Sequence, residues 1–231
     1  RAMVIAASGS HNILLSGPPG SGKSMILKRL PGILPDMKVD HAIESLKIRS
    51  LVKSPQQDLA LERPFRSPHH SISYAGMAGG GQKPQPGEIS LAHRGILFLD
   101  EFPEFSKQVL EILRQPLEDR KILISRANWS VEYPAHFLLV AAMNPCPCGY
   151  LTDPSVECEC AYTQIQRYHK KISGPILDRL DMILSVPRLS KSDLLEDGIP
   201  LDSVSLKAQV MACVSFQSER NQPCPNGDLS A

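Results

Sequence analysis

The chain has 231 residues, of which 42% are hydrophobic, and this suits one sizeable globular domain plus a fragment of a second. Its 25 basic and 24 acidic residues leave a formal charge of +1, which excludes net charge as a reason to expect nucleic-acid binding, so any such surface must be local. The longest apolar runs, such as residues 137–143, are too short to span a bilayer.

The chain shows no pattern of a signal peptide, and Arg1 in place of methionine indicates an excised piece of a longer protein. We therefore expect a cytoplasmic protein without membrane association. In such a reducing compartment disulfides are rare, so clustered cysteines favour a metal site over bridges.

The predicted elements alternate between strands and helices along the chain. Short apolar runs predict buried strands at residues 12–16, 95–101, 137–143 and 182–186. Helical patterns predict helices at residues 25–30, about 40–52, 108–117 and about 206–219, the first of them ended by Pro31 and Gly32. Two strand-like runs, 122–126 and 129–133, predict a hairpin, and residues 79–81 predict a mobile loop. The alternation favours a mostly parallel α/β sheet.

A phosphate-binding loop is predicted between the first strand and the first helix. Residues 17–24, GPPGSGKS, fit the pattern G-x-x-x-x-G-K-[ST], whose backbone N–H groups surround phosphate oxygens at the start of a helix. In that role Lys23 reaches the β- and γ-phosphates and Ser24 binds Mg²⁺. The alternative, a chance glycine-rich turn, is disfavoured by the acidic pair downstream. The candidate nucleotide-binding residues are Gly17, Pro18, Pro19, Gly20, Ser21, Gly22, Lys23, Ser24, Met25 and Asp100.

Polar residues end the next two strands. Asp100 and Glu101 follow the run GILFL, and we expect Asp100 to hold the Mg²⁺ shell and Glu101 to deprotonate the attacking water. Asn144 ends the strand after that, where an amide can hold the same water near the γ-phosphate. Alone, an acidic pair at a strand end is usually a solvated terminus, and an asparagine there is usually a turn former.

These motifs carry a family resemblance. The segments GPPGSGKS, GILFLDE, AAMN and SGPILDRLD resemble an AAA+ ATPase. More narrowly, RPFRSPHHSIS, PGEISLAHRGILFLDEFPEF, LRQPLEDRKILISRA, NPCPCGY and CEC resemble the magnesium-chelatase-like ComM/YifB family over about residues 1–190. The resemblance implies a P-loop AAA+ core with a parallel five-stranded sheet flanked by helices, a helix-2 insertion, a pre-sensor-1 hairpin and a Cys-rich loop.

The same resemblance implies ATP and Mg²⁺ as cofactors, a hexameric ring as the assembly and DNA as a partner. It implies an ATPase that acts as a branch-migration helicase in natural transformation and recombination. It also implies an N-terminal Lon-protease-like domain and a complete helical lid, which this sequence lacks. We therefore expect an ATPase core at 1–190 and a linker with the start of a truncated lid at 191–231, and a piece that alone is monomeric and a poor enzyme.

Arg179 is the candidate for a contact between subunits. It lies in residues 173–181, which resemble the AAA+ segment that presents an arginine to a neighbour's ATP. A planar guanidinium suits the charge that spreads over the γ-phosphate oxygens in the transition state. The alternative is a local salt bridge with Asp178 or Asp181, and Arg167 is the weaker candidate for the same role.

Four of the six cysteines fall within residues 146–160. Cys146, Cys148, Cys158 and Cys160 form two Cys-x-Cys pairs that can supply four thiolates to a structural Zn²⁺, which would hold together a loop with little apolar content. An iron–sulfur cluster also takes four thiolates, but nothing else indicates electron transfer. Free thiols are the other alternative. For His169, a position on a helix surface is favoured over the role of a substitute metal ligand. Cys213 and Cys224 lie apart from the four in the sequence and are expected to be ordinary cysteines.

Two basic residues are the DNA candidates. Residues 63–94 hold four Arg or Lys residues and three histidines against one acid, and they resemble the helix-2 insertion that projects toward the pore of this clade. Lys83 in this segment and Arg126 in the hairpin could contact phosphates. For His69 and His70, packing or hydrogen bonding is favoured over metal binding. Trp129 could stack on a base, but a role in the core or in an interface is at least as well supported.

Three functions remain open from the sequence. The first is a DNA-translocating ATPase, and the second is a protein-remodelling or metal-insertion ATPase like that of magnesium chelatase. The third, a nucleotide-gated scaffold without turnover, is disfavoured by intact Lys23, Asp100 and Glu101. The CPCG–CEC loop and the PHH segment favour the first over the second through resemblance alone.

Overall fold

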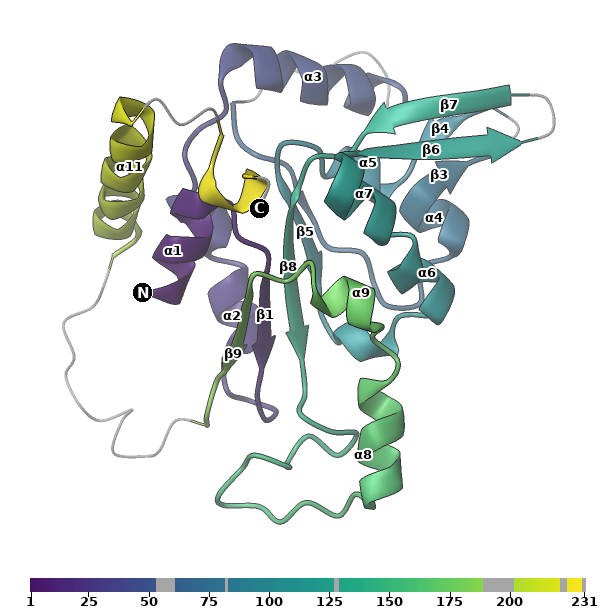
Figure 1. The fold of residues 1–231 in the computed structure, drawn as a ribbon, viewed down its shortest axis with the longest axis vertical. Coiled ribbons are helices and arrows are strands. Elements are labelled where there is room, and N and C mark those ends of the chain that lie inside the picture. Colours follow the sequence, from purple (N-terminus) through teal and green to yellow (C-terminus); the bar gives the residue numbers. More distant parts are fainter. Residues whose placement is uncertain (53–60, 82, 127–128, 189–201, 221–223, 230–231) are drawn as a thin grey trace. The chain divides into compact units, whose positions relative to one another are not determined.

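The computed structural model describes residues 1–52, 61–81, 83–126, 129–188, 202–220 and 224–229. The chain divides into two compact units. The first unit comprises residues 1–35, 141–171 and 180–231, and the second comprises residues 36–140 and 172–179. A five-stranded sheet has the strand order β2-β5-β8-β1-β9, which confirms the predicted parallel α/β architecture. Figure 1 labels β5, β8, β1 and β9 among its strands.

The first unit is built on two parallel strands. The strands β1 (Ile13–Ser16) and β9 (Met182–Ser185) pair in register from Ile13 opposite Met182 to Ser16 opposite Ser185. β1 is buried because its residues are apolar on both faces, as expected for a central parallel strand. The helical elements of this unit are α1 (Ala2–Gly9), α2 (Lys23–Leu27), η1 (Leu30–Ile33), α8 (Tyr162–His169), α11 (Ser203–Glu219) and η3 (Asn226–Asp228).

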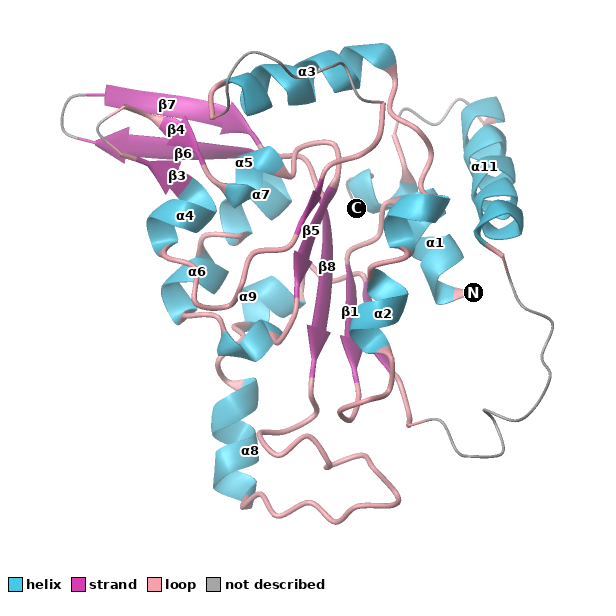
Figure 2. Ribbon diagram, turned by 180° about the vertical axis from the view of Figure 1, so that it is seen from behind, coloured by secondary structure: helices cyan, strands magenta, loops and turns pink. Residues whose placement is uncertain are grey.

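The two ends of the first unit meet. α11 packs against α1 and η1, as Figure 2 shows for α11 and α1. The first predicted helix is shorter than expected: α2 ends at Leu27, and Pro31 and Gly32 lie within the 3-10 helix η1 instead of ending the α-helix. Proline is acceptable there because the first N–H groups of a helical turn have no partner within the turn.

The second unit holds the parallel pair β2 (Phe65–Arg66) and β5 (Ile96–Leu99) and two antiparallel pairs. The antiparallel pairs are β3 (Gly79–Gly80) with β4 (Gln85–Pro86), and β6 (Lys121–Arg126) with β7 (Trp129–Pro134). Its helical elements are α3 (Val39–Ser50), α4 (Tyr74–Ala78), α5 (Glu88–Leu91), η2 (Phe102–Glu104), α6 (Lys107–Glu111), α7 (Arg114–Asp119) and α9 (Gly174–Leu177). Strand β8 (Leu138–Met143), fully buried, is divided between the two units.

The predicted hairpin is confirmed. β6 and β7 pair from Lys121 opposite Pro134 to Arg126 opposite Trp129 (Figure 1). Ile122, Ile124 and Tyr133 are buried while Leu123 is exposed, so one face of the hairpin packs on the unit, as the period of two in a strand requires.

Two predictions for the second unit are wrong. Residues 108–117 form two short helices, α6 and α7, instead of one. Gly79 is not in an open loop: it is buried in β3 with φ of 104°, and a Cβ there would lie 2.4 Å from the carbonyl oxygen of Gln85. The backbone of β4 approaches so closely that only glycine fits at this position. The sequence pattern alone predicts a mobile loop at the same glycine.

A buried polar network lies in the second unit. His93 is 3% exposed, its Nδ1 accepts a hydrogen bond from the backbone N–H of His136 at 3.0 Å, and its Nε2 lies 3.2 Å from Glu44 Oε2. Arg94 Nε donates to the same carboxylate oxygen at 2.9 Å. Burial lowers the pKa of His93 to about 4, so the imidazole is neutral near pH 7. In the described part of the chain, no helix is long and apolar enough to cross a membrane.

Candidate functional site

The predicted phosphate loop connects β1 to α2 in the first unit. Gly17 begins it, donating its N–H to the carbonyl oxygen of Met143 at 3.3 Å. A Cβ on Gly17 would lie 2.1 Å from the carbonyl oxygen of Val186, so no other residue fits between these backbones. Gly20 and Gly22 have φ of 77° and 83°, the left-handed conformation that turns the loop into the helix. The glycine positions of the motif are therefore the ones that the backbone path demands.

Lys23 and Asn144 come together in this unit. The Lys23 ammonium is buried and donates to the carbonyl oxygens of Gly17 and Pro18 at 2.7 and 2.9 Å, and to Asn144 Oδ1 at 3.3 Å. A lysine ammonium held over the loop, beside an amide at a strand end, is the arrangement with which a P-loop binds the terminal phosphates of a nucleotide. Of the other loop residues, Ser21 is buried, Ser24 is half-buried in the first turn of α2, and Met25 is 64% exposed.

The acidic pair lies in the second unit, directly after β5. Asp100 Oδ1 accepts the backbone N–H of Glu101 at 3.0 Å, and Glu101 has φ of 53°. The Glu101 carboxylate is 57% exposed, and its Oε2 lies 2.9 Å from His70 Nδ1. The Ser24 hydroxyl in the first unit and the Asp100 carboxylate in the second are each oxygen ligands of the kind that Mg²⁺ prefers.

Sequence reasoning missed His70 as a partner of Glu101. Packing and hydrogen bonding were expected for the two histidines and are confirmed: the rings of His69 and His70 lie 4.1 Å apart, and that of His70 meets Phe105 edge-on. The contact with Glu101 follows from topology. β2 and β5 are parallel neighbours, so the residues after Arg66 and after Leu99 leave the same edge of the sheet. A two-residue strand is too short to be recognised from its sequence pattern, and without β2 this adjacency is hidden.

Arg179 follows α9 in the second unit and has a partner within the chain. Its Nη2 donates to Glu118 Oε2 at 2.9 Å, and both side chains are partly exposed. The sequence offered a pair with Asp178 or Asp181 as the local alternative, whereas the partner Glu118 is 61 residues away along the chain, and Asp181 accepts the backbone N–H of Asn12 at 2.6 Å. Arg167, the weaker candidate, is exposed on α8.

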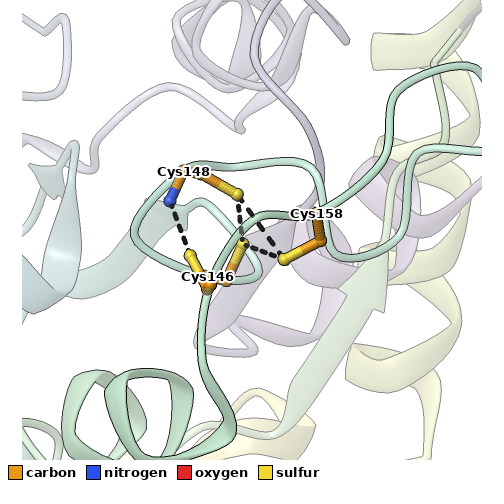
Figure 3. Close-up of side chains that lie close together, drawn as sticks. Cys146, Cys148 and Cys158 are labelled. Carbon is orange, nitrogen blue, oxygen red and sulfur yellow. Dashed lines mark hydrogen bonds between the residues drawn. The ribbon is translucent and has the colours of Figure 1, made fainter.

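The four predicted cysteine ligands converge in the first unit. The sulfur atoms of Cys146, Cys148, Cys158 and Cys160 all lie within 4.8 Å of one another, and none of these four cysteines is in a disulfide. The sulfur of Cys146 is 3.3 Å from that of Cys148 and 3.7 Å from that of Cys158, and Cys148 and Cys158 are 3.6 Å apart (Figure 3). The two sulfur atoms of a disulfide lie about 2.05 Å apart, so these distances exclude disulfides among Cys146, Cys148 and Cys158.

The surroundings of the cluster hold it in place. The Cys148 N–H donates to the sulfur of Cys160 at 3.4 Å, and a backbone hydrogen bond from Tyr150 lowers the pKa of the Cys148 thiol to about 6. His169 is not a ligand: its Nε2 lies 3.0 Å from the carbonyl oxygen of Pro145, which ties α8 to the start of the loop. Cys213 and Cys224 lie outside the cluster, as expected.

The basic residues of 63–94 are mostly engaged within the second unit. Arg66 makes two hydrogen bonds of 2.6 Å to Glu88, Arg63 donates to the carbonyl oxygen of Arg94, and Arg94 itself binds Glu44. Lys83 is exposed between β3 and β4. Arg126 ends β6 opposite the half-buried Trp129, and its side chain lies outside the described part of the structure.

A strand, a closed phosphate loop and a helix on a parallel α/β sheet define the core of a P-loop ATPase. The chain matches the family model described as magnesium chelatase, subunit ChlI, over residues 1–194. It therefore belongs to the magnesium-chelatase-like family, in the group that includes ComM and YifB, and is an AAA+-type ATPase core.

The relatives place this core within longer proteins. The chain is 48% identical over 225 residues to competence protein ComM of Haemophilus influenzae, covering 95% of this chain and 43% of that protein. It is 46% identical over 222 residues to the uncharacterized protein YifB of Escherichia coli, covering 95% and 44%. Over 156 residues it is 26% identical to the chloroplastic magnesium-chelatase subunit ChlI of Nicotiana tabacum, covering 58% and 37%. The chain thus spans less than half the length of these curated relatives.

Proposed function

We propose that this chain is the motor core of a ring-forming ATPase that moves DNA, acting as a branch-migration helicase in natural transformation and recombination. The observation that carries the ATPase part is the closed phosphate loop with the Lys23 ammonium between its carbonyl oxygens and Asn144. The DNA part rests on similarity to a protein named for competence, covering 95% of this chain.

In the proposed reaction, the oxygen of a water molecule forms a bond to the γ-phosphorus of ATP. The bond from that phosphorus to the β–γ bridging oxygen breaks, and ADP and phosphate leave. Glu101 accepts the proton of the attacking water, Asn144 orients that water, and Lys23 with the loop N–H groups balances the phosphate charge. Mg²⁺, when bound, supplies further positive charge at the phosphates, and Ser24 and Asp100 are the residues that would hold it.

Arg179 has the proposed role of completing a neighbour's site in a hexameric ring. A head-to-tail contact that closes on itself repeats the same arginine at each site. In the single chain Arg179 pairs with Glu118 through exposed atoms, a contact of small net worth that a nucleotide phosphate can replace. A mixture of full-length parent and Arg179→Ala subunits tests this role, because the loss of an arginine that acts in trans lowers turnover at neighbouring sites whose own residues are intact.

The experiment that tests the DNA role uses the full-length protein. ATP turnover is measured with no DNA, with single-stranded DNA and with a four-way junction, and strand exchange at a labelled junction is followed in parallel. Stimulation by DNA together with ATP-dependent junction movement is expected. Turnover that DNA leaves unchanged would contradict the proposal and would favour the alternative of a protein-remodelling or metal-insertion ATPase, which the 26% identical chelatase subunit motivates.

We also propose that the four cysteines bind one structural Zn²⁺. Sulfurs about 2.3 Å from a central zinc in a tetrahedron lie about 3.8 Å from one another, close to the separations of 3.6 and 3.7 Å that Cys158 makes with Cys148 and Cys146. Elemental analysis of full-length protein purified without chelators should find about one zinc per chain, and Cys158→Ser should lose it. Metal-free protein whose six thiols all react with a thiol reagent under native conditions would contradict the site, and iron in place of zinc would redefine it.

A further inference from the structure

We infer that the four-cysteine loop is a support for the phosphate loop, so that metal in the cysteine site is needed for tight nucleotide binding. The inference rests on the proposed zinc and nucleotide sites and adds a dependence of one on the other. All the residues that carry it belong to the first unit.

The first observation is a direct approach of the two loops. Gly149 follows Cys148, has φ of 89°, and lies against the ring of Pro19 in the phosphate loop. A Cβ on Gly149 would lie 2.7 Å from Pro19 Cδ and 2.8 Å from Pro19 Cγ, distances that real Cβ atoms do not show. Both atoms belong to a stiff ring whose backbone is part of the phosphate loop, so the cysteine loop limits where that loop can lie.

The second observation is a connection through the chain. Asn144, which accepts from the Lys23 ammonium at 3.3 Å, lies two residues before Cys146. Its Cγ would be 3.7 Å from a Cβ on Gly149, so the amide lies between the cysteine loop and the lysine. Pro145, the residue between Asn144 and Cys146, is held through its carbonyl oxygen by His169 on α8.

The third observation is that the cysteine loop has few apolar side chains to hold it, and its contacts outside the sulfurs are polar, such as the 3.4 Å hydrogen bond from Arg188 to Asp153. Between Cys148 and Cys160 the side chains are mostly polar, and Leu151 and Val156 are exposed. Asp153 is buried and accepts from the backbone N–H and hydroxyl of Ser155, which orders one turn. A metal that joins both ends of this excursion therefore sets the position of Gly149 and Asn144, which in turn set the phosphate loop.

The test separates nucleotide affinity from metal content in the full-length protein. Gly149→Ala is expected to keep one zinc per chain and to bind a fluorescent ADP analogue roughly tenfold more weakly, because the added methyl must displace the Pro19 ring and because a φ of 89° strains alanine. Pro19→Ala in the same chain should recover the part of that loss that comes from the clash, since the ring is what the added methyl meets. Gly32→Ala is the matched control, because a Cβ there meets nothing within 4 Å and its φ is not left-handed.

The metal side is tested by Cys158→Ser and by a chelator. Both should remove zinc and weaken ADP-analogue binding by a similar factor, and returning Zn²⁺ to the chelated parent should restore it. Cys213→Ser, an exposed thiol outside the cluster, should change neither. The chelator arm uses the parent chain, so it decides the question even if Cys158→Ser fails to fold.

The outcomes distinguish the inference from the proposals beneath it. Zinc loss with unchanged nucleotide binding, or Gly149→Ala binding like the parent, would overturn the support role while leaving zinc and ATP binding intact. A parent without zinc would refute the metal site itself, and a parent without nucleotide binding would refute the ATPase proposal.

Discussion

Glu101 adopts a left-handed backbone conformation, with φ of 53°, that is uncommon for any residue except glycine. Strained backbone of this kind is often found where a side chain must be aimed at a reacting group. The conformation places the Glu101 N–H on Asp100 Oδ1 and the carboxylate beside His70, so one turn brings these three side chains together. Substitutions of Glu101, Lys23 and His70 can therefore test the role of each side chain separately.

The first prediction concerns the separate roles of Glu101 and Lys23. Glu101→Gln in the full-length protein should slow ATP turnover by roughly 10²–10⁴ while leaving nucleotide affinity near that of the parent, because it removes the base and keeps the shape. Lys23→Ala should instead abolish tight nucleotide binding, since it removes the charge over the loop. Turnover is measured by phosphate release and affinity with a fluorescent ADP analogue. A Glu101→Gln protein that hydrolyses ATP at the parent rate would refute the assignment of the base.

The second prediction concerns His70 as a positioning residue. His70→Ala should lower kcat by roughly 10–100-fold at nearly unchanged KM, because the carboxylate loses the group 2.9 Å away that orients it. His70→Asn, whose side-chain nitrogen can replace Nδ1, should recover part of the loss. His69→Ala is the matched control, since Nδ1 of His69 faces Ser71 instead of Glu101. If His69→Ala and His70→Ala slow turnover equally, the two histidines serve packing alone.

At the scale of elements, the hairpin β6–β7 and the pair β3–β4 hold the two basic residues proposed to contact DNA, Arg126 in β6 and Lys83 between β3 and β4. The hairpin packs one face on the unit, and Tyr133 Oη donates to the carbonyl oxygen of Pro84 beside β4 at 3.0 Å. Glu132 lies opposite Leu123 and pairs with Lys121 at 2.9 Å. The acid of the hairpin is therefore engaged at the end away from Arg126.

Arg126→Ala should thus lower DNA affinity of the full-length protein similarly for all sequences and flatten its dependence on salt, because phosphate contacts carry no sequence information. Lys121→Ala, on the same strand, is the matched control and should leave affinity unchanged. Fluorescence anisotropy at several salt concentrations measures both. An equal effect of the two substitutions would indicate general surface charge, and no effect of either would end the role of this hairpin in DNA binding.

The His93 network predicts how the second unit responds to acid. Burial lowers the pKa of His93 to about 4, against 6.5 when unfolded, while Glu44, Arg94 and His136 face it. As pH falls, this histidine therefore gains its proton first in the unfolded chain. The free energy of unfolding then decreases progressively from about pH 6.5 to about pH 4, by up to about 1.4 kcal/mol per pH unit.

His93→Asn, which can keep the bond from the His136 N–H, should reduce the slope of the unfolding free energy with pH in that window by about one proton. Urea unfolding followed by circular dichroism at several pH values measures it. His69→Asn is the control for removing a histidine outside the buried network, because that side chain is exposed. A parent and a His93→Asn protein with the same slope between pH 4 and pH 6.5 would contradict the buried neutral imidazole.

At the scale of the whole molecule, local patterns were enough wherever a motif and its structure occupy the same short stretch. The phosphate loop, the acidic strand end after β5, the β6–β7 hairpin and the grouping of four thiols were all predicted, because glycine geometry, apolar runs and ligand spacing act within some fifteen residues. The five-stranded count rested on family resemblance, since β2 has two residues and no period to detect.

Only the tertiary structure decided which distant residues meet. It paired Glu101 with His70 across parallel strands, Arg179 with Glu118, and Glu44 with His93, and it brought Gly149 against Pro19. It also showed Gly79 to be packed where the sequence indicated a loop. The physical reason is that composition and spacing report the preferences of a segment for its own backbone, whereas side-chain partners are set by strand order and by the space that remains once strands and helices have packed.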